Sequence, residues 1–485
     1  MSPRPPIVAI LGHVDHGKTT LLDYIRKSRL ASHEHGGITQ RIGAYEIVTE
    51  FKDYVTHKIT FIDTPGHEAF AKLRARGATI ADIALLIIDA KDSVMPQTIE
   101  SISHIKEANI PFIVVLNKID LPDANPEKVK NDLLKYEVVV EDKGGTVPTV
   151  AISSAKGTGV ANLLESILLL AEDLKLQYDP ANPAQAYIIE HKKDKRGVVV
   201  SAIIKDGRIT VGTTVFAAKE KTRVRALIND LGKQVRAILP SSPFELLGFT
   251  ELPEVGTLIT TAEPAKSTIP SATAAPVERT IDPALLYATP QKEEKKLSLI
   301  IKTDTHGSLE AILAALGNKN NMTIVLAAVG AINKSDVFLA KTTASIIIGF
   351  ASDTSSEVTG LAKQEKVIIK TYNIIYELFD ELEEVADLLK EKELTEKNIK
   401  AEAKVLANFV IEGEKVCGVK VTKGKINMDD SAEVYRNDNL IGKTKLVSLK
   451  IRAKTVSEVR KEQEAGMVFS PQLDIRMGDV IKFIL

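Results

Sequence analysis

The stretch that decides the fold is Gly12-His13-Val14-Asp15-His16-Gly17-Lys18-Thr19, which follows the apolar run at 7–11 and precedes a helix-like run at 20–25. This order is typical of a strand, a phosphate-binding loop and a helix. With the spacing G-x-x-x-x-G-K-T, backbone N–H groups wrap a di- or triphosphate, Lys18 reaches the β and γ oxygens, and the Thr19 hydroxyl is offered to Mg²⁺. The start of the helix adds its partial positive charge. Taken alone, the loop leaves ATPases, kinases and GTPases open.

A second motif, Asp63-Thr64-Pro65-Gly66-His67, follows the strand-like run at 59–62. A carboxylate at a strand end near the phosphate loop can hold Mg²⁺, and the N–H of Gly66 can donate to a γ-phosphate. Asp63 by itself would more often be the N-cap of a helix. The motif therefore counts only together with the others.

Two further motifs point to the base. Asn117-Lys118-Ile119-Asp120 ends the apolar run at 111–116, and Ser154-Ala155-Lys156 follows the strand-like run at 149–152. Asp120 can accept hydrogen bonds from N1–H and the N2 amine of guanine, whereas adenine would leave the carboxylate unpaired at a cost of roughly 1–3 kcal/mol or more. Backbone N–H groups of the second loop can meet guanine O6. The base is therefore predicted to be guanine.

All of these motifs stand at the ends of apolar runs, as a doubly wound parallel sheet requires. Their combination predicts a GTP/GDP site with Mg²⁺ as cofactor. The metal ligands are predicted to be Thr19, Thr39 and Asp63. The predicted GTP-binding residues are Asp15, His16, Gly17, Lys18, Thr19, Thr20, Gly66, Asn117, Lys118, Asp120, Ser154, Ala155 and Lys156.

Hydrolysis needs a positioned water and neutralised phosphoryl oxygens. His67, directly after Gly66, is the predicted catalytic residue and would orient that water. The segment Gly36-Gly37-Ile38-Thr39-Gln40 is predicted to be a switch loop that orders on GTP, with Thr39 completing the Mg²⁺ shell. Val14 and Ile38 could wall off His67 until a partner repositions it. Since no arginine finger is assignable, we expect slow intrinsic turnover that a partner stimulates.

Composition bounds the class of protein. The chain has 485 residues, of which 44% are hydrophobic and 26% charged, enough for three to four domains. It shows no signal-peptide pattern and no apolar run of about 20 residues, so we expect a cytoplasmic protein that does not associate with a membrane. Its single cysteine excludes an internal disulfide. A net charge of −1 means that any RNA contact must depend on local patches.

Changes in pattern along the chain predict a multidomain α/β and β protein. The expected parts are a P-loop GTPase domain at 1–177, a β-barrel at 178–263, a linker at 264–296, a small α/β layer domain at 297–372, a long connecting helix at 373–398 and a C-terminal β-barrel at 399–485. The helix is amphipathic, and its acids Glu381, Glu383 and Glu384 are expected to form a solvated face rather than a metal site.

The last segment is locally basic. Against the single acid Glu458, residues 442–461 contain Lys443, Lys445, Lys450, Arg452, Lys454, Arg460 and Lys461. Charge alone favours an ordinary solvated surface. If the cluster binds RNA, its phosphate contacts would make that binding depend on salt without specifying a base sequence.

At this point the chain resembles a known family. The phosphate loop, the segment at 36–40, the motif at 63–70 and the motif at 117–120 resemble those of translational GTPases, and among them most closely the bacterial-type translation initiation factor two family. The similarity continues through Gly330-Ala331-Ile332, Ser335-Asp336-Val337 and other segments over nearly the whole chain. It implies a ribosome-stimulated GTPase that promotes binding of initiator tRNA to the small ribosomal subunit and the joining of the subunits, acting as a monomer.

The resemblance also implies that the terminal barrel holds the aminoacyl end of formylmethionyl initiator tRNA. Gly418, Lys450, Glu464 and Gly466 fall on matching positions, whereas the basic-aromatic run that follows the lysine in the family is here Ile451-Arg452-Ala453. The predicted tRNA-binding residues are these four together with Arg452. Two family cysteines are replaced by Val419 and Ala465, and the adjacent Cys417 does not restore the pattern. Preference for a formylated methionine therefore stays open.

Three other functions remain open. An elongation-type factor that delivers tRNA would share the GTPase motifs but is not expected to carry the segment around Gly330 and the long helix. A GTPase coupled to a metabolic enzyme would need no RNA, and turnover stimulated by ribosomes separates it from a translation factor. A binding platform with negligible hydrolysis would be exposed by single-turnover kinetics.

Overall fold

The computed structural model of this chain describes residues 1–26, 39, 42–218, 220–263, 296–317, 321–411, 414–437, 439–452 and 454–484. Backbone packing divides it into two compact units, Met1–Asp380 and Glu381–Leu485, which we describe separately. Gly36, Gly37, Ile38 and Gln40 of the predicted switch loop lie outside the described residues, as does 264–295 of the predicted linker.

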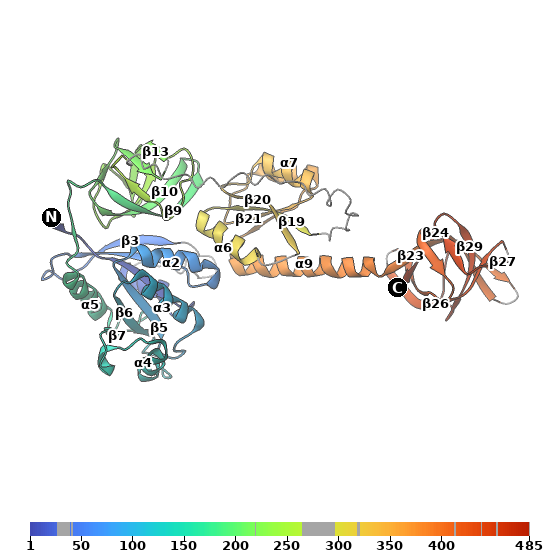
Figure 1. Ribbon diagram of the computed structural model, residues 1–485, viewed down its shortest axis with the longest axis horizontal. Coiled ribbons are helices and arrows are strands. Elements are labelled where there is room, and N and C mark those ends of the chain that lie inside the picture. Colours follow the sequence, from blue (N-terminus) through green and yellow to red (C-terminus); the bar gives the residue numbers. More distant parts are fainter. Residues whose placement is uncertain are drawn as a thin grey trace, which may run out of the picture. The chain divides into compact units, whose positions relative to one another are not determined.

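The first unit begins with a six-stranded sheet of order β3-β4-β2-β5-β6-β7, flanked by helices (Figure 1). Only β3 is antiparallel to its neighbour; the other strands are parallel. The elements are β2 Ile7–Gly12, β3 Gly43–Val48, β4 Lys58–Asp63, β5 Ile83–Asp89, β6 Phe112–Asn117, β7 Thr149–Ala151, α1 Lys18–Arg26, α2 Ala71–Ile80, α3 Pro96–Ala108, α4 Pro126–Leu133 and α5 Val160–Asp173.

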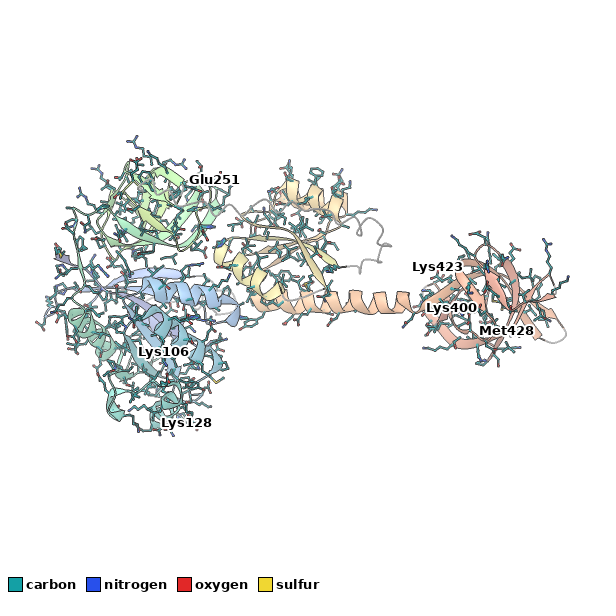
Figure 2. All side chains as sticks on the ribbon, in the orientation of Figure 1. Lys106, Lys128, Glu251, Lys400, Lys423 and Met428 are labelled. Atoms are coloured by element: carbon teal, nitrogen blue, oxygen red, sulfur yellow. The ribbon has the colours of Figure 1, made fainter. Side chains whose placement is uncertain are left out.

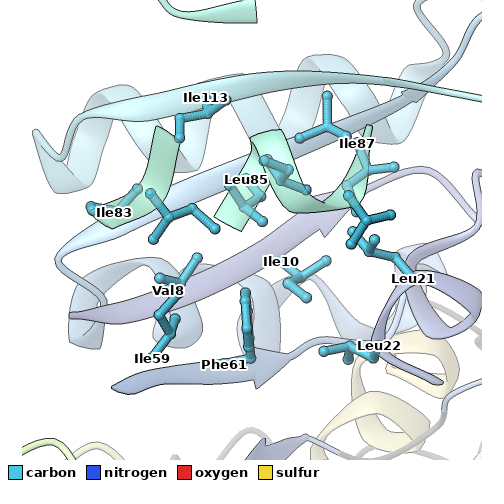
Figure 3. Packing of buried hydrophobic residues seen from close by; sticks show 14 of the residues in the cluster. Val8, Ile10, Leu21, Leu22, Ile59, Phe61, Ile83, Leu85, Ile87 and Ile113 are labelled. Carbon is cyan, nitrogen blue, oxygen red and sulfur yellow. The ribbon is translucent and has the colours of Figure 1, made fainter. Parts of the chain in front are cut away.

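The core of this sheet explains its apolar strands. Figure 3 shows Val8 and Ile10 of β2 and Phe61 of β4 packed in one cluster with Leu21 and Leu22 of α1. Every residue of β2 and β5 is buried. Strands covered on both faces need continuous apolar sequences, and each fully buried large side chain contributes about 1.5–3 kcal/mol. The polar residues that follow these strands are thereby gathered at the carboxyl edge of the sheet.

An antiparallel β layer follows, with strand order β13-β12-β18-β9-β10-β17-β14-β15. Alternating residues of its strands enclose an apolar core that includes Ile188, Val200, Leu227 and Leu246. The strands are β9 Gln185–Asp194, β10 Gly197–Asp206, β12 Thr214–Ala217, β13 Glu220–Arg223, β14 Ala226–Asn229, β15 Gln234–Val235, β17 Pro243–Leu247 and β18 Leu258–Thr260, with short ladders of β11 Ile209–Thr210 on β16 Ala237–Ile238 and of β1 Ser2–Pro3 on β8 Gln177–Tyr178.

The third layer of the first unit is a parallel sheet of order β20-β19-β21-β22. Helices α6 to α8 connect its strands, and their N-caps Thr305, Asn333 and Ser355 accept hydrogen bonds from the first turns. The elements are β19 Leu297–Thr303, α6 His306–Leu316, β20 Met322–Val329, α7 Lys334–Thr343, β21 Ile346–Phe350, α8 Ser356–Glu365 and β22 Ile369–Tyr372.

Helix α9, Ile375–Lys397, follows β22 and crosses the boundary between the units. Ile375 and Leu378 are fully buried, so the first turn is anchored in the first unit. Glu383 and Glu384 are exposed, as a solvated face requires. Among the described residues no cluster of His, Cys, Asp and Glu suited to a metal ion occurs.

A buried carboxyl joins the second layer of the first unit to the third. Glu190 of β9 is 6% exposed, and its carboxylate oxygens accept the N–H of Gly307 at the start of α6 at 3.1 and 3.2 Å. Beside it, Arg76 of α2 pairs with Glu310 of α6 at 3.2 Å. Burial raises the pKa of Glu190 to about 7, even though the N–H groups of His191 and Gly307 favour the charged form.

This carboxyl predicts a pH dependence of stability. Because the folded pKa of Glu190 lies above its ordinary value of 4.5, the folded state binds more protons between 4.5 and about 7, and its stability falls as pH rises through that range. Glu190→Gln cannot ionise. We expect the variant to gain stability relative to the parent as pH rises from 5 to 8, up to about 3 kcal/mol at about 1.36 kcal/mol for each pH unit. Thermal midpoints of both proteins across this range check it, and a constant difference would contradict it.

The second unit contains a closed β-barrel. Its strands pair in the order β23-β30-β25-β26-β29-β24, and β24 pairs again with β23, which closes a six-stranded ring. Val405, Val419, Leu446 and Met467 lie in its core. The strands are β23 Ile399–Ile411, β24 Glu414–Asn427, β25 Ser431–Arg436, β26 Asn439–Ile451, β29 Glu464–Ser470 and β30 Val480–Ile484, with β27 Lys454–Thr455 on β26 and β28 Glu458–Arg460 on β24.

The surface of this barrel is rich in charge, and Figure 2 labels Lys400 of β23 and Lys423 of β24 on it. Lys400 pairs with Asp430 at 2.7 Å, whereas Lys423 is exposed.

The predicted fold class is confirmed: the chain combines a parallel α/β sheet, antiparallel β-barrel layers, a smaller α/β layer and a long helix. In the part of the chain that the structure describes, no helix is both long enough and apolar enough to cross a bilayer.

Candidate functional site

The phosphate loop joins β2 to α1 in a conformation that requires glycine. Gly12 and Gly17 have φ values of +143° and +88°. A Cβ at Gly12 would lie 2.3 Å from the carbonyl oxygen of Ile87, and one at Gly17 would lie 2.3 Å from Nδ2 of Asn117. The loop is thus held against β5 and against the residue that ends β6, with Asp15 (φ +61°) turning the chain between the glycines.

Lys18 lies within this loop. Its ammonium donates to the carbonyl oxygens of Gly12 at 3.0 Å and His13 at 2.5 Å. The side chain is buried, and desolvation lowers the pKa of Lys18 to about 8 although Asp63 opposes the shift. An anion beside the ammonium would favour the charged form, as a phosphate-binding lysine requires.

Three oxygen-bearing side chains converge beside the loop. The hydroxyls of Thr19 and Thr39 are 2.6 Å apart, and Thr39 Oγ1 donates to Asp63 Oδ2 at 3.5 Å. The structure therefore brings together the side chains predicted to hold Mg²⁺. Hydroxyl and carboxylate oxygens are the donors that this hard cation prefers.

The loop after β4 lies against the phosphate loop. A Cβ at Gly66 would lie 2.5 Å from Nζ of Lys18 and 3.0 Å from the backbone nitrogen of Val14. Only a glycine fits this approach without displacing the lysine.

Arg74 fixes the loop after β4 by hydrogen bonds to its backbone. The residue is fully buried, and Nη1 donates to the carbonyl oxygens of Pro65 at 2.9 Å and His67 at 2.5 Å. Nη2 donates to both carboxylate oxygens of Glu100 at 2.7 Å. Sequence reasoning missed Arg74, since nothing in a helical pattern marks one arginine as buried.

His67 lines the pocket beside Gly66. Its Nδ1 accepts the N–H of Ala69 at 2.9 Å, which in a neutral imidazole leaves the ring proton on Nε2. The ring lies edge-on to Phe70, with centroids 6.1 Å apart, and tilted against Tyr376, with centroids 4.5 Å apart. Sequence reasoning also missed Tyr376, which is more than 300 residues away along the chain.

The base-reading motif is tied to the phosphate loop by Asn117. Its Nδ2 donates to the carbonyl oxygen of His16 at 2.8 Å, and its Oδ1 accepts the N–H and hydroxyl of Ser154 at 3.0 and 2.8 Å. Lys118 adopts a φ of +60° and pairs with Asp89 at 2.7 Å.

Asp120, the residue predicted to select guanine, stands among polar partners. A hydrogen bond from the Ser153 side chain, assisted by Lys156 at 3.6 Å, lowers the pKa of Asp120 below its ordinary value. The carboxylate is therefore ionised at neutral pH, in the form that accepts hydrogen bonds. Ala155 and Lys156 are exposed.

A cavity of about 250 Å³ joins the phosphate loop, the loop after β4 and the start of α9. Its lining is Val14, Asp15, Gly17, Lys18, Thr19, Thr20, Thr39, Gly66, His67, Phe70, Lys118 and Tyr376. Most predicted phosphate and metal residues are thus in one place. Among the predicted residues outside this lining, His16 turns inward: its side chain is 1% exposed with Nδ1 3.3 Å from the carbonyl oxygen of Ile87, and burial lowers its pKa to about 4.

In the second unit, the residues predicted to bind tRNA lie on three neighbouring strands. Gly418 pairs with Gly466, and Gly466 pairs with Lys450. Their neighbours Val419 and Ala465 are buried and directly paired, so the glycines and Lys450 face outward. Glu464 lies on the same outward row of β29, and Arg452 (φ +46°) stands in the turn after β26.

The basic cluster is partly neutralised, because Lys443 pairs with Glu433 at 2.8 Å, Lys445 with Asp429 at 3.3 Å and Arg460 with Glu458 at 2.7 Å. Lys450 makes no ion pair with any residue that the structure describes. The side chain of Cys417 is buried opposite Met467 in the barrel core.

Comparison with known proteins agrees with this architecture. Residues 4–173 match the family model of the elongation factor Tu GTP binding domain, residues 183–262 match elongation factor G domain 2, and residues 278–383 match translation-initiation factor 2. The fold and these matches define a GTPase of the translation-factor class.

The relatives are more specific. Translation initiation factor IF-2 of Halothermothrix orenii is 41% identical over 99% of this chain and 71% of its own length, and that of Thermotoga petrophila is 42% identical over the same shares. This chain belongs to the translation initiation factor IF-2 family. A solved structure described as GDP-bound aIF5B from Aeropyrum pernix is 25% identical, with a TM-score of 0.47, over 99% of this chain and 92% of that one.

Proposed function

We propose that this chain binds GTP in the cavity beside the phosphate loop, hydrolyses it on the ribosome, and promotes initiator-tRNA binding to the small subunit and subunit joining. The observation that carries the proposal is that Thr19, Thr39 and Asp63 converge beside the phosphate loop. Thr19 and Thr39 line one cavity together with Lys18 and His67. Ribosomes and initiator tRNA enter as the partners of a translation initiation factor, and the ribosome implies a cytoplasmic site of action.

Each residue has a chemical task in this proposal. Lys18 and the backbone N–H groups of the phosphate loop bind the phosphates, and Asp120 accepts hydrogen bonds from guanine. Thr19, Thr39 and Asp63 would hold Mg²⁺, which neutralises charge on the β and γ oxygens.

Hydrolysis adds water at the γ-phosphorus and breaks the bond to the bridging β–γ oxygen, giving GDP and phosphate. His67 would orient the attacking water. We expect intrinsic turnover to be slow until the ribosome acts.

The direct test is recruitment of initiator tRNA to purified small ribosomal subunits. We expect recruitment with GTP and little with GDP. Turnover that ribosomes do not stimulate would instead favour a GTPase coupled to a metabolic enzyme.

We further propose that the outward row around Gly418, Gly466 and Lys450, with Arg452 and Glu464, binds the aminoacyl end of initiator tRNA. A Cβ at Gly418 would lie 3.3 Å from the ring of Phe409, which is 54% exposed. A side chain at this position would therefore crowd an apolar surface beside the exposed cation of Lys450. Such a surface suits a methionyl group next to a phosphate.

Lys450→Ala is expected to weaken initiator-tRNA binding about tenfold, as for loss of one hydrogen bond to a charged group. It should also reduce the slope of log affinity against log salt by roughly 0.7–0.9. Filter binding across a salt series measures both, and Lys423→Ala on the exposed part of β24 is the matched control. Equal effects of the two substitutions would contradict the assignment, and equal affinity for formylated and unformylated initiator tRNA would exclude selectivity for the formyl group.

A further inference from the structure

The first turn of α9 reaches the catalytic side of the nucleotide cavity. Tyr376 lines that cavity together with Gly66 and His67. Its ring centroid lies 4.5 Å from that of His67, and the two planes are inclined by 48°. Both residues belong to the first compact unit.

Tyr376 is not the residue that anchors the helix. Ile375 and Leu378 are fully buried and Leu382 is 4% exposed, so these side chains carry the packing of α9. Tyr376 is 42% exposed and lies off their row. Replacement of the Tyr376 side chain is therefore expected to leave the packing of α9 intact and the unit folded.

The imidazole of His67 is held from several directions. Tyr376 packs on the ring, Phe70 meets it edge-on, and the N–H of Ala69 donates to Nδ1 at 2.9 Å. Arg74 fixes the backbone of the same residue through its carbonyl oxygen at 2.5 Å. A side chain held in this way loses the rotamer freedom that it needs to follow a water molecule.

We propose that Tyr376 is a positioning residue that restrains His67 in the free factor, and that displacement of the first turn of α9 releases the imidazole for hydrolysis. This inference rests on the proposed role of His67. The restraint comes from an element that continues into the second unit through its own chain, from Ile375 to Lys397. In this proposal the rate of hydrolysis depends on the position of the first turn of α9 as well as on the bound nucleotide.

The size of the effect follows from the contact. Aromatic pairs of this kind are worth an amount that corresponds to about three- to tenfold in rate. We therefore expect Tyr376→Ala to raise the rate of GTP hydrolysis by the isolated 485-residue chain about three- to tenfold. Tyr376→Phe keeps the ring and should hydrolyse GTP at the parental rate.

Single-turnover hydrolysis without ribosomes tests this with the two variants and with the double variant His67→Ala, Tyr376→Ala. The gain should disappear in the double variant. The ratio of ribosome-stimulated to intrinsic rates should fall. NMR supplies a readout without catalysis: ring protons of His67 should lose the upfield shift caused by the tyrosine ring in Tyr376→Ala and keep it in Tyr376→Phe.

Unchanged or slower intrinsic hydrolysis in Tyr376→Ala, with parental GTP affinity and thermal midpoint, would overturn the inference. So would a gain that persists after loss of His67. These outcomes differ from failure of the proposed function, in which His67→Ala would retain ribosome-stimulated turnover. If His67→Ala loses that turnover while Tyr376→Ala behaves like the parent, only the restraint is wrong.

Discussion

His67→Ala is expected to bind GTP with parental affinity and to lose about 10²- to 10⁴-fold of the ribosome-stimulated rate of hydrolysis, the range for a missing general acid–base or water-orienting group. Binding should persist because the phosphate contacts proposed for Lys18 and the base contacts proposed for Asp120 do not involve this side chain. Quench-flow measurement of phosphate release after mixing with ribosomes gives the rate, and fluorescent nucleotide titration gives the affinity.

The matched control is His57→Ala, because His57 is an exposed histidine whose Nδ1 lies 2.9 Å from the carbonyl oxygen of Phe51 in a surface loop. It undergoes the same chemical change and should keep the parental rate. Parental ribosome-stimulated turnover in His67→Ala would remove this histidine from the mechanism and leave backbone groups or a ribosomal residue to orient the water.

Asp120→Asn is expected to exchange the base that the protein accepts. An asparagine offers one acceptor and one donor where the carboxylate offers two acceptors, so the N2 amine of guanine loses its partner. Hydrogen bonds to charged groups are worth about 1.5–3 kcal/mol, so affinity for GTP should fall by about 10²-fold. Xanthine carries a carbonyl in place of that amine, and xanthosine triphosphate should bind the variant better than GTP does.

Competition titrations with GTP, ATP and xanthosine triphosphate measure this exchange. Asp123→Asn, at an aspartate with a 70% exposed side chain that pairs with Lys91 at 3.4 Å, supplies a control three residues away. If Asp120→Asn keeps its preference for GTP, guanine is read by other groups. If the parent binds ATP as well as GTP, the predicted selection by this carboxylate fails altogether.

The nucleotide site was predictable because its parts are local in sequence. Each motif follows a buried apolar strand, and a parallel sheet brings the carboxyl ends of such strands together. Spacing alone was therefore enough to predict that Lys18, Gly66 and Asn117 gather around the phosphate loop, and the structure places them there. Their roles in binding a nucleotide stay predictions. The structure adds the reason for each glycine, such as the 2.5 Å approach of a Cβ at Gly66 to the lysine ammonium.

Other parts depend on packing that no local pattern encodes. Arg74 is fully buried only because two carbonyl oxygens and Glu100 surround it, and Tyr376 reaches His67 only through the placement of α9. The ion pairs of the basic cluster in the terminal barrel depend on packing in the same way. Charges counted along a sequence do not reveal that Glu433 and Asp429, on neighbouring strands and turns, neutralise two of its lysines.

The side-chain amide of Asn117 joins the loop predicted to bind phosphate to the loop predicted to bind the base, through hydrogen bonds with His16 and Ser154. Base selection and phosphate binding are therefore expected to be coupled, because a change in the position of one loop would also move the other. A variant designed to bind a different nucleotide should therefore keep Asn117 and change only Asp120. Such a substitution would then change which nucleotide is bound without weakening the binding of its phosphates.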